Sequence, residues 1–300
     1  MKVGTFRVAG ERRVGVLDEA AGSVRPFALE SRDAERGVET LARRAAEGLP
    51  LPELGDPVAL SDIKLDAPIP RPRRNIFCVG KNYHDHAQEF ASSGFDSSAA
   101  AGAVPKVPII FSKVPESVIA AGEDIVMDSA VDPSVDYEVE LTVIIGKGGR
   151  GITKADALKH VWGYTIVNDV TARDLQGRHS QWLIGKSQDT FCPMGPWAVT
   201  ADEIDLANTT VKTFVNGDKR QDSNTKLLIF DVPTIIETLS AGITLLPGDV
   251  IATGTPAGVG IGFKPPRYLG HGDVVRCEIS GIGALENRIV DRARQAQAAD

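Results

Sequence analysis

The sequence predicts an α+β fold that is rich in β-strands. The prediction rests on many short strand-like runs separated by tight turns and on few helical patterns. Strands and helices also do not alternate regularly, as they would in a Rossmann sheet. The 30 glycines and 18 prolines suit frequent tight turns. With 300 residues, 42% of them hydrophobic and 24% charged, the chain has an ordinary globular composition and the length of about two domains.

Residues 1–70 predict a small N-terminal α/β domain. Residues 3–8 and 13–17 are short strand-like runs with a turn between them, and a helical pattern follows at 38–46. Prolines at positions 50, 52, 68, 70 and 72 then interrupt the chain, and proline at this density favours an extended linker. We therefore expect the first domain to end near residue 70.

Residues 71–300 predict a second domain built mainly from strands. Thr153 and Asp156 fit a capping box for a short helix that ends at His160. The small residues from Ser93 to Gly102 fit a flexible lid over a site. Strand-like runs occupy 75–80, 107–111, 137–145, 161–167, 210–215, 249–253 and 273–279.

Two glutamates, Glu138 and Glu140, stand two residues apart in a predicted strand. Alternate residues of a strand point to the same face, so the two carboxylates share one face. Because an apolar run follows, burial would force the pair to share a proton, meet cations or bind a metal. Asp169, at the end of another apolar strand, offers a third carboxylate. Three hard oxygen donors favour Mg²⁺, Mn²⁺ or Ca²⁺ over zinc, and a solvated sheet face is the alternative.

His86 and Glu89 follow the strand that ends at Gly80, and on a helix they would be neighbours three residues apart. A carboxylate beside an imidazole orients it and raises its basicity, which suits a general base. His84 stands in the same segment, so the residues alone leave open which imidazole acts. A helix cap with a solvated histidine is the alternative interpretation.

Arg173, Gln176 and Lys186 are candidate donors to carboxylate or enolate oxygens. The glycine-rich segment 252–260 could hold a small anion through its backbone N–H groups and hydroxyls. This segment lacks the G-x-x-x-x-G-K-[ST] pattern of a phosphate-binding loop, and its glycines form no dinucleotide fingerprint.

The composition argues against several classes of protein. The 33 basic residues against 40 acidic ones give a net charge of −7, which disfavours a nucleic-acid partner. No apolar run approaches the ~20 residues of a membrane helix, and the N-terminus lacks the apolar stretch of a signal peptide. Cys78, Cys192 and Cys277 are widely spaced, so we expect no disulfide framework and a cytoplasmic location.

Taken together, five blocks resemble the fumarylacetoacetate hydrolase (FAH) family in the family's order. The resemblance covers roughly residues 75 to 290. It implies a mixed β-roll catalytic domain, FAH-type, behind the small N-terminal domain, usually in a homodimer. The matching blocks are 79–83 with His86 and Glu89; 136–141; 163–164 with 168–174; Gln176 with Lys186; and 253–260.

The same resemblance implies a divalent ion, Mg²⁺ or Mn²⁺, held by Glu138, Glu140 and Asp169. Members of the family act on 2-oxo acids by acylpyruvate hydrolysis, oxaloacetate decarboxylation or isomerisation of hydroxymuconate-type dienes. Lys81 and Tyr83 join the expected substrate-binding residues. Position 81 carries lysine where many relatives carry arginine, which leaves the identity of the substrate open.

We therefore expect a metal-dependent hydrolase that cleaves a 2,4-dioxo acid, such as an acylpyruvate or fumarylpyruvate, into pyruvate and a carboxylic acid. His86, oriented by its neighbouring glutamate, would take a proton from the attacking water, and the metal would stabilise the leaving enolate. Lys186 and Gln176 would donate to developing oxyanions, while Thr255 and Arg173 hold the substrate carboxylate. An oxaloacetate decarboxylase or a 2-hydroxymuconate-type isomerase would use the same enolate. A non-catalytic metal-binding scaffold is the remote alternative.

Overall fold

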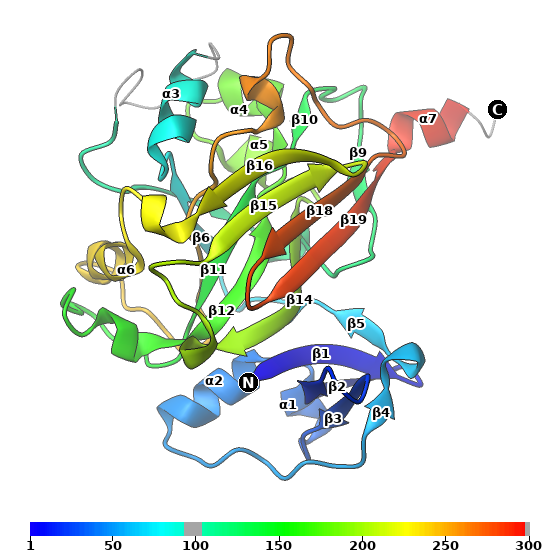
Figure 1. Cartoon of the computed structure of the whole chain (residues 1–300), viewed down its shortest axis with the longest axis vertical. Helices are drawn as coiled ribbons and strands as arrows, with labels where there is room; N and C mark the ends of the chain where they lie inside the picture. The colour runs from blue at the N-terminus through cyan, green and yellow to red at the C-terminus, as the bar shows by residue number, and fades with distance from the viewer. Residues whose placement is uncertain (93–103, 298–300) are drawn as a thin grey trace.

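The computed structural model describes residues 1–92 and 104–297 of the chain. The lid expected at residues 93–102 lies outside the described residues. Figure 1 shows the N-terminal strands and helices, in blue, below and the rest of the chain above them.

A 12-stranded mixed sheet forms the body of the molecule. Its strands are β1 (Lys2–Val8), β2 (Glu11–Asp18), β3 (Ser23–Pro26), β4 (Val58–Ala59), β5 (Lys64–Asp66), β6 (Ile76–Gly80), β7 (Ile109–Lys113), β8 (Val118–Ile119), β11 (Val139–Ile145), β12 (Val161–Asn168), β14 (Cys192–Thr200) and β17 (Val250–Ala252). The order across the sheet is β4-β3-β2-β1-β14-β12-β11-β17-β6-β7, while β5 pairs with β1 and β8 with β14.

A second sheet of five strands has the order β16-β15-β18-β19-β9 and lies at the front in Figure 1. Its strands are β9 (Ile125–Met127), β15 (Thr210–Val215), β16 (Asp218–Asn224), β18 (Val274–Ile279) and β19 (Gly283–Asp291). The short strands β10 (Val135–Asp136) and β13 (Thr171–Ala172) form a separate pair. The fold is therefore rich in strands, as the sequence predicts.

Short helices connect the strands. The α-helices are α1 (Ser31–Ala34), α2 (Glu39–Ala46), α3 (His84–Ser92), α4 (Arg173–Arg178), α5 (Leu183–Lys186), α6 (Val232–Ser240) and α7 (Arg292–Gln297). The 3₁₀ turns are η1 (Leu60–Asp62), η2 (Pro115–Ser117), η3 (Ala157–His160), η4 (Ala201–Glu203), η5 (Thr225–Leu227) and η6 (Gly260–Gly262).

The N-terminal hairpin has the predicted strands and a tight turn. Ala9 and Gly10 both have positive φ, 49° and 86°, which is the backbone of a two-residue hairpin turn. The helix expected at 38–46 is α2. Strand β1 also pairs with β14, Lys2 opposite Val199, so these strands extend the large sheet. The domain boundary near residue 70 stays a prediction.

Some predicted elements differ from the structure. The capping-box helix is only the 3₁₀ turn η3, and the Thr153 hydroxyl donates to the Asp156 carboxylate at 3.0 Å instead of capping the backbone. The strand expected from Tyr137 begins at Val139, because β10 ends at Asp136 and pairs separately with β13. The sequence analysis also missed β14, β16, β19 and α6.

One end of the large sheet collects the segments that carry the candidate residues. Strand β17 runs parallel to β6 and antiparallel to β11, which in turn runs antiparallel to β12. The ends of β6, β12 and β17 therefore meet the start of β11. Helices α3, α4 and α5 lie around this end in the upper part of Figure 1.

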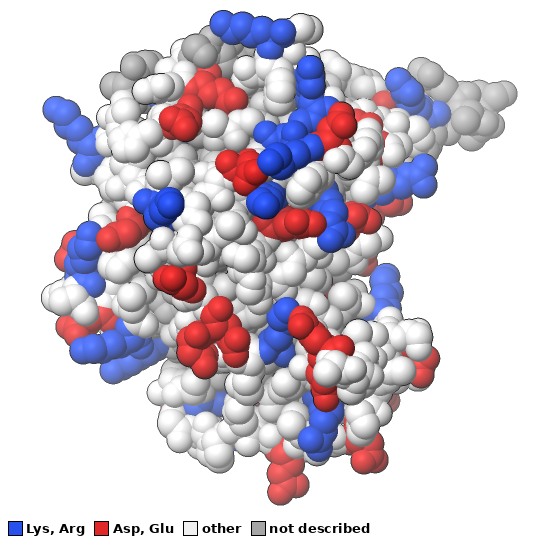
Figure 2. Space-filling model, in the orientation of Figure 1, with Lys and Arg blue, Asp and Glu red and all other residues white. Residues whose placement is uncertain are grey.

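The surface carries charges of both signs. On the face drawn in Figure 2, basic and acidic side chains are interspersed. Within residues 1–92 and 104–297, no helix has the length and apolar character needed to cross a membrane.

Candidate active site

Three carboxylates meet at this end of the large sheet. Glu138 directly precedes β11, Glu140 is the second residue of β11, and Asp169 directly follows β12. The backbone N–H of Asp169 donates to the Glu138 carbonyl at 2.8 Å, so these two acids are neighbours across the strand pair. One carboxylate oxygen from each acid lies within 4.8 Å of the others. The structure thus brings together the three acids that the sequence singled out.

The exposed fractions of Glu138, Glu140 and Asp169 are only 4%, 1% and 0%. Burial opposes the ionisation of Glu138, but the charges of Lys186 and Arg173 outweigh it and lower its pKa to about 2. For Glu140, burial and the charges of the other two acids act in the same direction and raise its pKa well above the ordinary value. A bound cation would relieve this excess of buried negative charge.

Two buried lysines neutralise part of the cluster. Lys186 Nζ lies 2.8 Å from Glu138 and 2.7 Å from Asp169. Lys113, at the end of β7, is 0% exposed and places Nζ 2.6 Å from the other oxygen of Asp169. It also donates to the carbonyl oxygens of Val170, at 3.1 Å, and of Lys186. Sequence reasoning missed Lys113, because a lysine at the end of an edge strand normally reaches solvent.

His86 and Glu89 form the predicted pair on α3. His86 Nδ1 lies 3.3 Å from Glu89 Oε2. Since the contact is at Nδ1, the proton held there directs the acceptor lone pair to Nε2 on the other side of the ring. His86 lines a pocket together with Glu138, whereas His84 is exposed. Of the two imidazoles, the structure therefore places His86 at the site.

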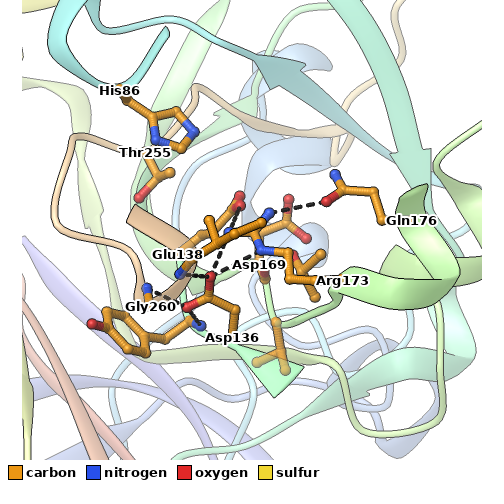
Figure 3. Close-up of polar contacts among 12 residues, drawn as sticks. His86, Asp136, Glu138, Asp169, Arg173, Gln176, Thr255 and Gly260 are labelled. Carbon is orange, nitrogen blue, oxygen red and sulfur yellow. Dashed lines mark hydrogen bonds and ion pairs between the residues drawn. The ribbon is translucent and has the colours of Figure 1, made fainter. Parts of the chain in front are cut away.

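The three predicted donors line the same pocket. Arg173 Nη2 lies 2.8 Å from Glu138, and Arg173 Nη1 donates to Gln176 Oε1 at 3.0 Å. Gly185 lets α5 pack closely on α4, since a Cβ there would lie 2.6 Å from the backbone nitrogen of Gln176. This close packing brings Lys186 to the cluster. In Figure 3, His86 lies to the left of the carboxylates, and Arg173 and Gln176 lie to their right.

The glycine-rich segment after β17 holds carboxylates of the protein itself. Gly254 N donates to Glu140 at 2.8 Å, and Gly258 N donates to both oxygens of Glu89 at 3.1 and 3.2 Å. The anions that these N–H groups bind are thus side chains from distant parts of the chain. This segment fixes one carboxylate of the cluster and one member of the dyad.

The same segment also holds Asp136, which the sequence analysis did not assign to the site. Gly260 N and Ile261 N donate to the Asp136 carboxylate at 2.6 and 3.0 Å. Thr255, the predicted substrate-binding hydroxyl, accepts from Gln221 Nε2 at 2.8 Å and lines the pocket. Its hydroxyl proton can therefore point to a ligand oxygen.

The pocket has an empty volume of about 290 Å³ and is also walled by Lys81, Phe111 and Trp182. Lys81 is buried with a positive φ of 53°, a conformation that non-glycine residues adopt where the surroundings enforce it. Tyr83, also predicted to bind substrate, is buried and lines a neighbouring pocket with His84. The pocket is thus lined by charged groups and closed by two aromatic rings.

A larger cleft lies between the N-terminal strands and the five-stranded sheet, with an empty volume of about 1860 Å³ that includes space open to solvent. Its charged residues pair with each other, as in Lys2 with Glu19 and Arg276 with Glu278. Glu138 and Glu140, two carboxylates whose pKa values are shifted in opposite directions, line the smaller pocket, which we therefore take as the candidate site.

Comparison with known protein families supports this choice. Residues 75–290 match the family model described as the C-terminal domain of fumarylacetoacetate (FAA) hydrolase. The chain belongs to the fumarylacetoacetate hydrolase family. The matched range contains every residue that lines the candidate pocket, and the family resemblance expected from the sequence is thereby confirmed.

The chain is similar to an oxaloacetate tautomerase, YisK, from Bacillus subtilis, with 49% identity over 83% of this chain and 81% of the relative. Among solved structures, fumarylacetoacetate hydrolase from Exiguobacterium antarcticum has 41% identity and a TM-score of 0.82, covering 97% of this chain and 100% of the other. A 2-hydroxyhepta-2,4-diene-1,7-dioate isomerase from Mycobacterium marinum has 33% identity and a TM-score of 0.77, covering 97% and 99%. These relatives include two isomerase-type enzymes.

The residues of this FAH-family site fit a divalent metal ion. Glu138, Glu140 and Asp169 offer hard oxygen ligands within 4.8 Å of one another, the donor type that Mg²⁺, Mn²⁺ and Ca²⁺ take. Burial, together with repulsion from Asp169 and Glu138, raises the pKa of Glu140, and a dication would counter that repulsion. The three carboxylates therefore suit a divalent metal ion but do not determine which one.

Proposed function

We propose that this protein is an oxaloacetate tautomerase, which interconverts the enol and keto forms of that 2-oxo acid. The reaction moves a proton between the C2 oxygen and C3, and it neither breaks a carbon–carbon bond nor consumes water. The observation that carries the proposal is the His86–Glu89 pair facing a buried carboxylate cluster across a small, cation-lined pocket. The similarity to YisK supports oxaloacetate as the substrate.

The size and charge of the pocket support a small dianionic substrate. Its empty volume of about 290 Å³ includes space that is open to solvent, so the room between the lining side chains is small. Lys81, Arg173 and Lys186 all line it, so the two carboxylates of a four-carbon acid would meet cationic groups. Phe111 and Trp182 limit the room for a longer acyl chain.

His86 is the proposed proton-transfer residue at C3. Glu89 holds its Nδ1 side, so Nε2 accepts the proton from C3 or returns it. Gln176 and Lys186 donate hydrogen bonds to the C2 oxygen as negative charge develops there. Thr255 and Lys81 hold the carboxylates.

Glu138, Glu140 and Asp169 would hold Mg²⁺ or Mn²⁺. When bound, such an ion supplies Lewis-acid stabilisation of negative charge on substrate oxygens. Lys113 keeps Asp169 in place from behind, through contacts to one carboxylate oxygen and two backbone carbonyls.

Hydrolysis of a 2,4-dioxo acid is the second candidate, as the sequence analysis expected. A histidine oriented by a carboxylate is also suited to deprotonate water, so the dyad fits either reaction. The small, cation-lined pocket and the similarity to YisK favour tautomerisation. The relatives YisK, a tautomerase, and the isomerase from Mycobacterium marinum favour isomerisation over hydrolysis. Oxaloacetate decarboxylation would proceed through the same enolate.

The test follows enol-oxaloacetate by ultraviolet absorbance with the purified protein and Mg²⁺, and analyses the products by NMR. We expect rapid conversion to the keto form without release of pyruvate. H86N should lose the acceleration, while H84N, which changes the exposed imidazole on the same helix, should keep it. Pyruvate release from oxaloacetate or from acylpyruvates, without faster tautomerisation, would replace the proposal by decarboxylation or hydrolysis.

The homodimer, the cytoplasmic location and the lack of a nucleic-acid partner stay predictions from the sequence.

A further inference from the structure

Asp136 is a buried carboxylate at the centre of a network next to the site. It is 0% exposed and follows Val135 in β10. One of its oxygens accepts from Tyr137 N at 2.8 Å and Gly260 N at 2.6 Å. The other accepts from Ile261 N at 3.0 Å and from Arg173 Nε at 2.9 Å, and it forms an ion pair with Arg173 Nη2 at 2.8 Å. One oxygen therefore accepts from two backbone N–H groups, whereas the other accepts from one backbone N–H group and from Arg173.

Arg173 connects Asp136 to the residues of the pocket. Its Nε and Nη2 are directed at Asp136, and Nη2 also lies 2.8 Å from Glu138. With these contacts, the planar guanidinium has one orientation, and Nη1 donates to Gln176 Oε1 at 3.0 Å. Figure 3 shows this chain of contacts from Asp136 through Arg173 to Gln176.

The contact with Arg173 decides which way the Gln176 amide faces. A guanidinium only donates, so the amide must present its oxygen to Arg173. The amide NH₂ group then points away from Arg173 and serves as a donor in the pocket that Gln176 lines. Without that contact the amide could turn over and present an acceptor to a developing oxyanion.

We propose that Asp136 is a positioning residue: it holds Arg173 so that Gln176 presents its NH₂ group, and not its oxygen, to the substrate. The proposal rests on the proposed function for the identity of the reaction. Asp136 is not among the described residues that line the pocket, so it acts through Arg173 and has no contact with the substrate.

D136N separates the contacts of Asp136 with backbone N–H groups from its contact with Arg173. An asparagine oxygen can still accept from Gly260 N and Tyr137 N, whereas the amide NH₂ that replaces the other oxygen faces the donors of Arg173. The substitution keeps the volume and removes the anchor. We expect kcat for tautomerisation to fall about 10- to 100-fold, a loss comparable to that of one oxyanion donor, with a smaller change in KM.

D249N is the matched control. Asp249 is also a buried aspartate that accepts from an arginine, Arg74 Nε at 2.9 Å, and from a backbone N–H, Leu246 N at 2.6 Å. It lies just before β17, at the opposite end of that strand from Thr253 and Gly254. D249N therefore makes the same chemical change away from the pocket, and it should lower stability while kcat stays within about twofold of wild type.

A double-mutant cycle with Q176A tests the relay itself. If Asp136 acts through Gln176, then D136N should reduce kcat by less than about twofold in the Q176A background. If D136N lowers kcat as much in Q176A as it does in the wild type, the proposal is overturned. A wild-type kcat for D136N alone would also overturn it. Should D136N fail to fold, R173K replaces it in the cycle, because lysine keeps the charge but lacks the fork that reaches Gln176.

Binding of oxalate in the presence of Mg²⁺, measured by calorimetry, gives a second readout that needs no turnover. Oxalate is a planar dianion that resembles an enolate of a 2-oxo acid. D136N and Q176A should weaken its binding by similar factors, and the double variant should weaken it no further. An additive loss, or no oxalate binding to the wild type, overturns the relay. A wild type that binds oxalate but leaves enol-oxaloacetate unchanged overturns the proposed function alone.

Discussion

Gly262 offers a way to separate the His86–Glu89 pair without changing either residue. A Cβ built at Gly262 would lie less than 3.0 Å from Oε1, Cδ and Cγ of Glu89. Gly262 is not at a positive φ, so alanine suits the backbone, and the side chain that must move is flexible. G262A should therefore fold and displace the Glu89 carboxylate.

The distance that the Glu89 carboxylate must move predicts how far kcat falls. Non-bonded heavy atoms keep about 3.5–4.0 Å apart, so the carboxylate must retreat by roughly 1 Å or more. The contact between His86 Nδ1 and Glu89 Oε2 is already 3.3 Å long, and a hydrogen bond does not survive that movement. A well-oriented general base is worth about 10²–10⁴ in rate. Losing the orientation but not the base should cost about 10- to 100-fold in kcat, or about 1.4–2.7 kcal/mol.

The assay is the rate of enol-oxaloacetate conversion at saturating Mg²⁺, with Mg²⁺ affinity measured by calorimetry on the same sample. G270A is the control, because a Cβ at Gly270 would meet only Asp273 at 3.8 Å, an ordinary contact in the same loop region. We expect G270A to match the wild type in rate and both variants to bind Mg²⁺ normally. A G262A enzyme with wild-type kcat would refute the role of Glu89 in orienting His86.

Further predictions concern the metal cluster and the fold. E138A should abolish Mg²⁺ binding in calorimetry, and unchanged affinity would remove Glu138 from the ligand set. K113M should lower the free energy of unfolding in urea by about 3–5 kcal/mol, since it leaves the buried Asp169 without one partner; a loss below about 1 kcal/mol would contradict the buried pair. D231A should cost about 1 kcal/mol at neutral pH, because Asp231 caps α6 through Thr234 N at 2.9 Å. Burial raises the pKa of Asp231, but its hydrogen bonds to Thr234 outweigh this and lower it. The charge-dependent part of that stability is therefore complete above the unfolded pKa of ~3.9 and is lost as the pH falls through the lower folded value, so the gap between D231A and wild type should narrow in acid unfolding curves.

The sequence predicted the two glutamates of the carboxylate cluster and the His86–Glu89 pair because both depend on local spacing. The two-residue spacing of Glu138 and Glu140 holds on any extended backbone, so it survives although β11 begins only at Val139. The three-residue spacing of His86 and Glu89 likewise needs only a helix. The two imidazoles could not be separated from the sequence, because whether a residue of α3 faces the pocket depends on how α3 packs.

Asp136 and Lys113 could not be predicted, because their partners are distant in sequence. Asp136 meets Gly260 across 124 residues, and Lys113 meets Asp169 across 56 residues, spacings that no periodic pattern encodes. The glycine-rich segment was recognised as an anion-binding segment by its N–H groups. That its N–H groups bind Glu89, Glu140 and Asp136 depends on how the strands and helix α3 are arranged in the fold.

The stereochemistry of proton transfer tests the central claim most directly. With a single base, His86, on one side of the pocket, enol-oxaloacetate converted in D₂O should receive deuterium on one face of C3. Immediate reduction to malate by malate dehydrogenase and NADH traps this product before it exchanges, and NMR determines its configuration. The account predicts a single deuterated diastereomer with the wild type and an even mixture with H86N. An even mixture from the wild type, at a rate above the uncatalysed one, would contradict it.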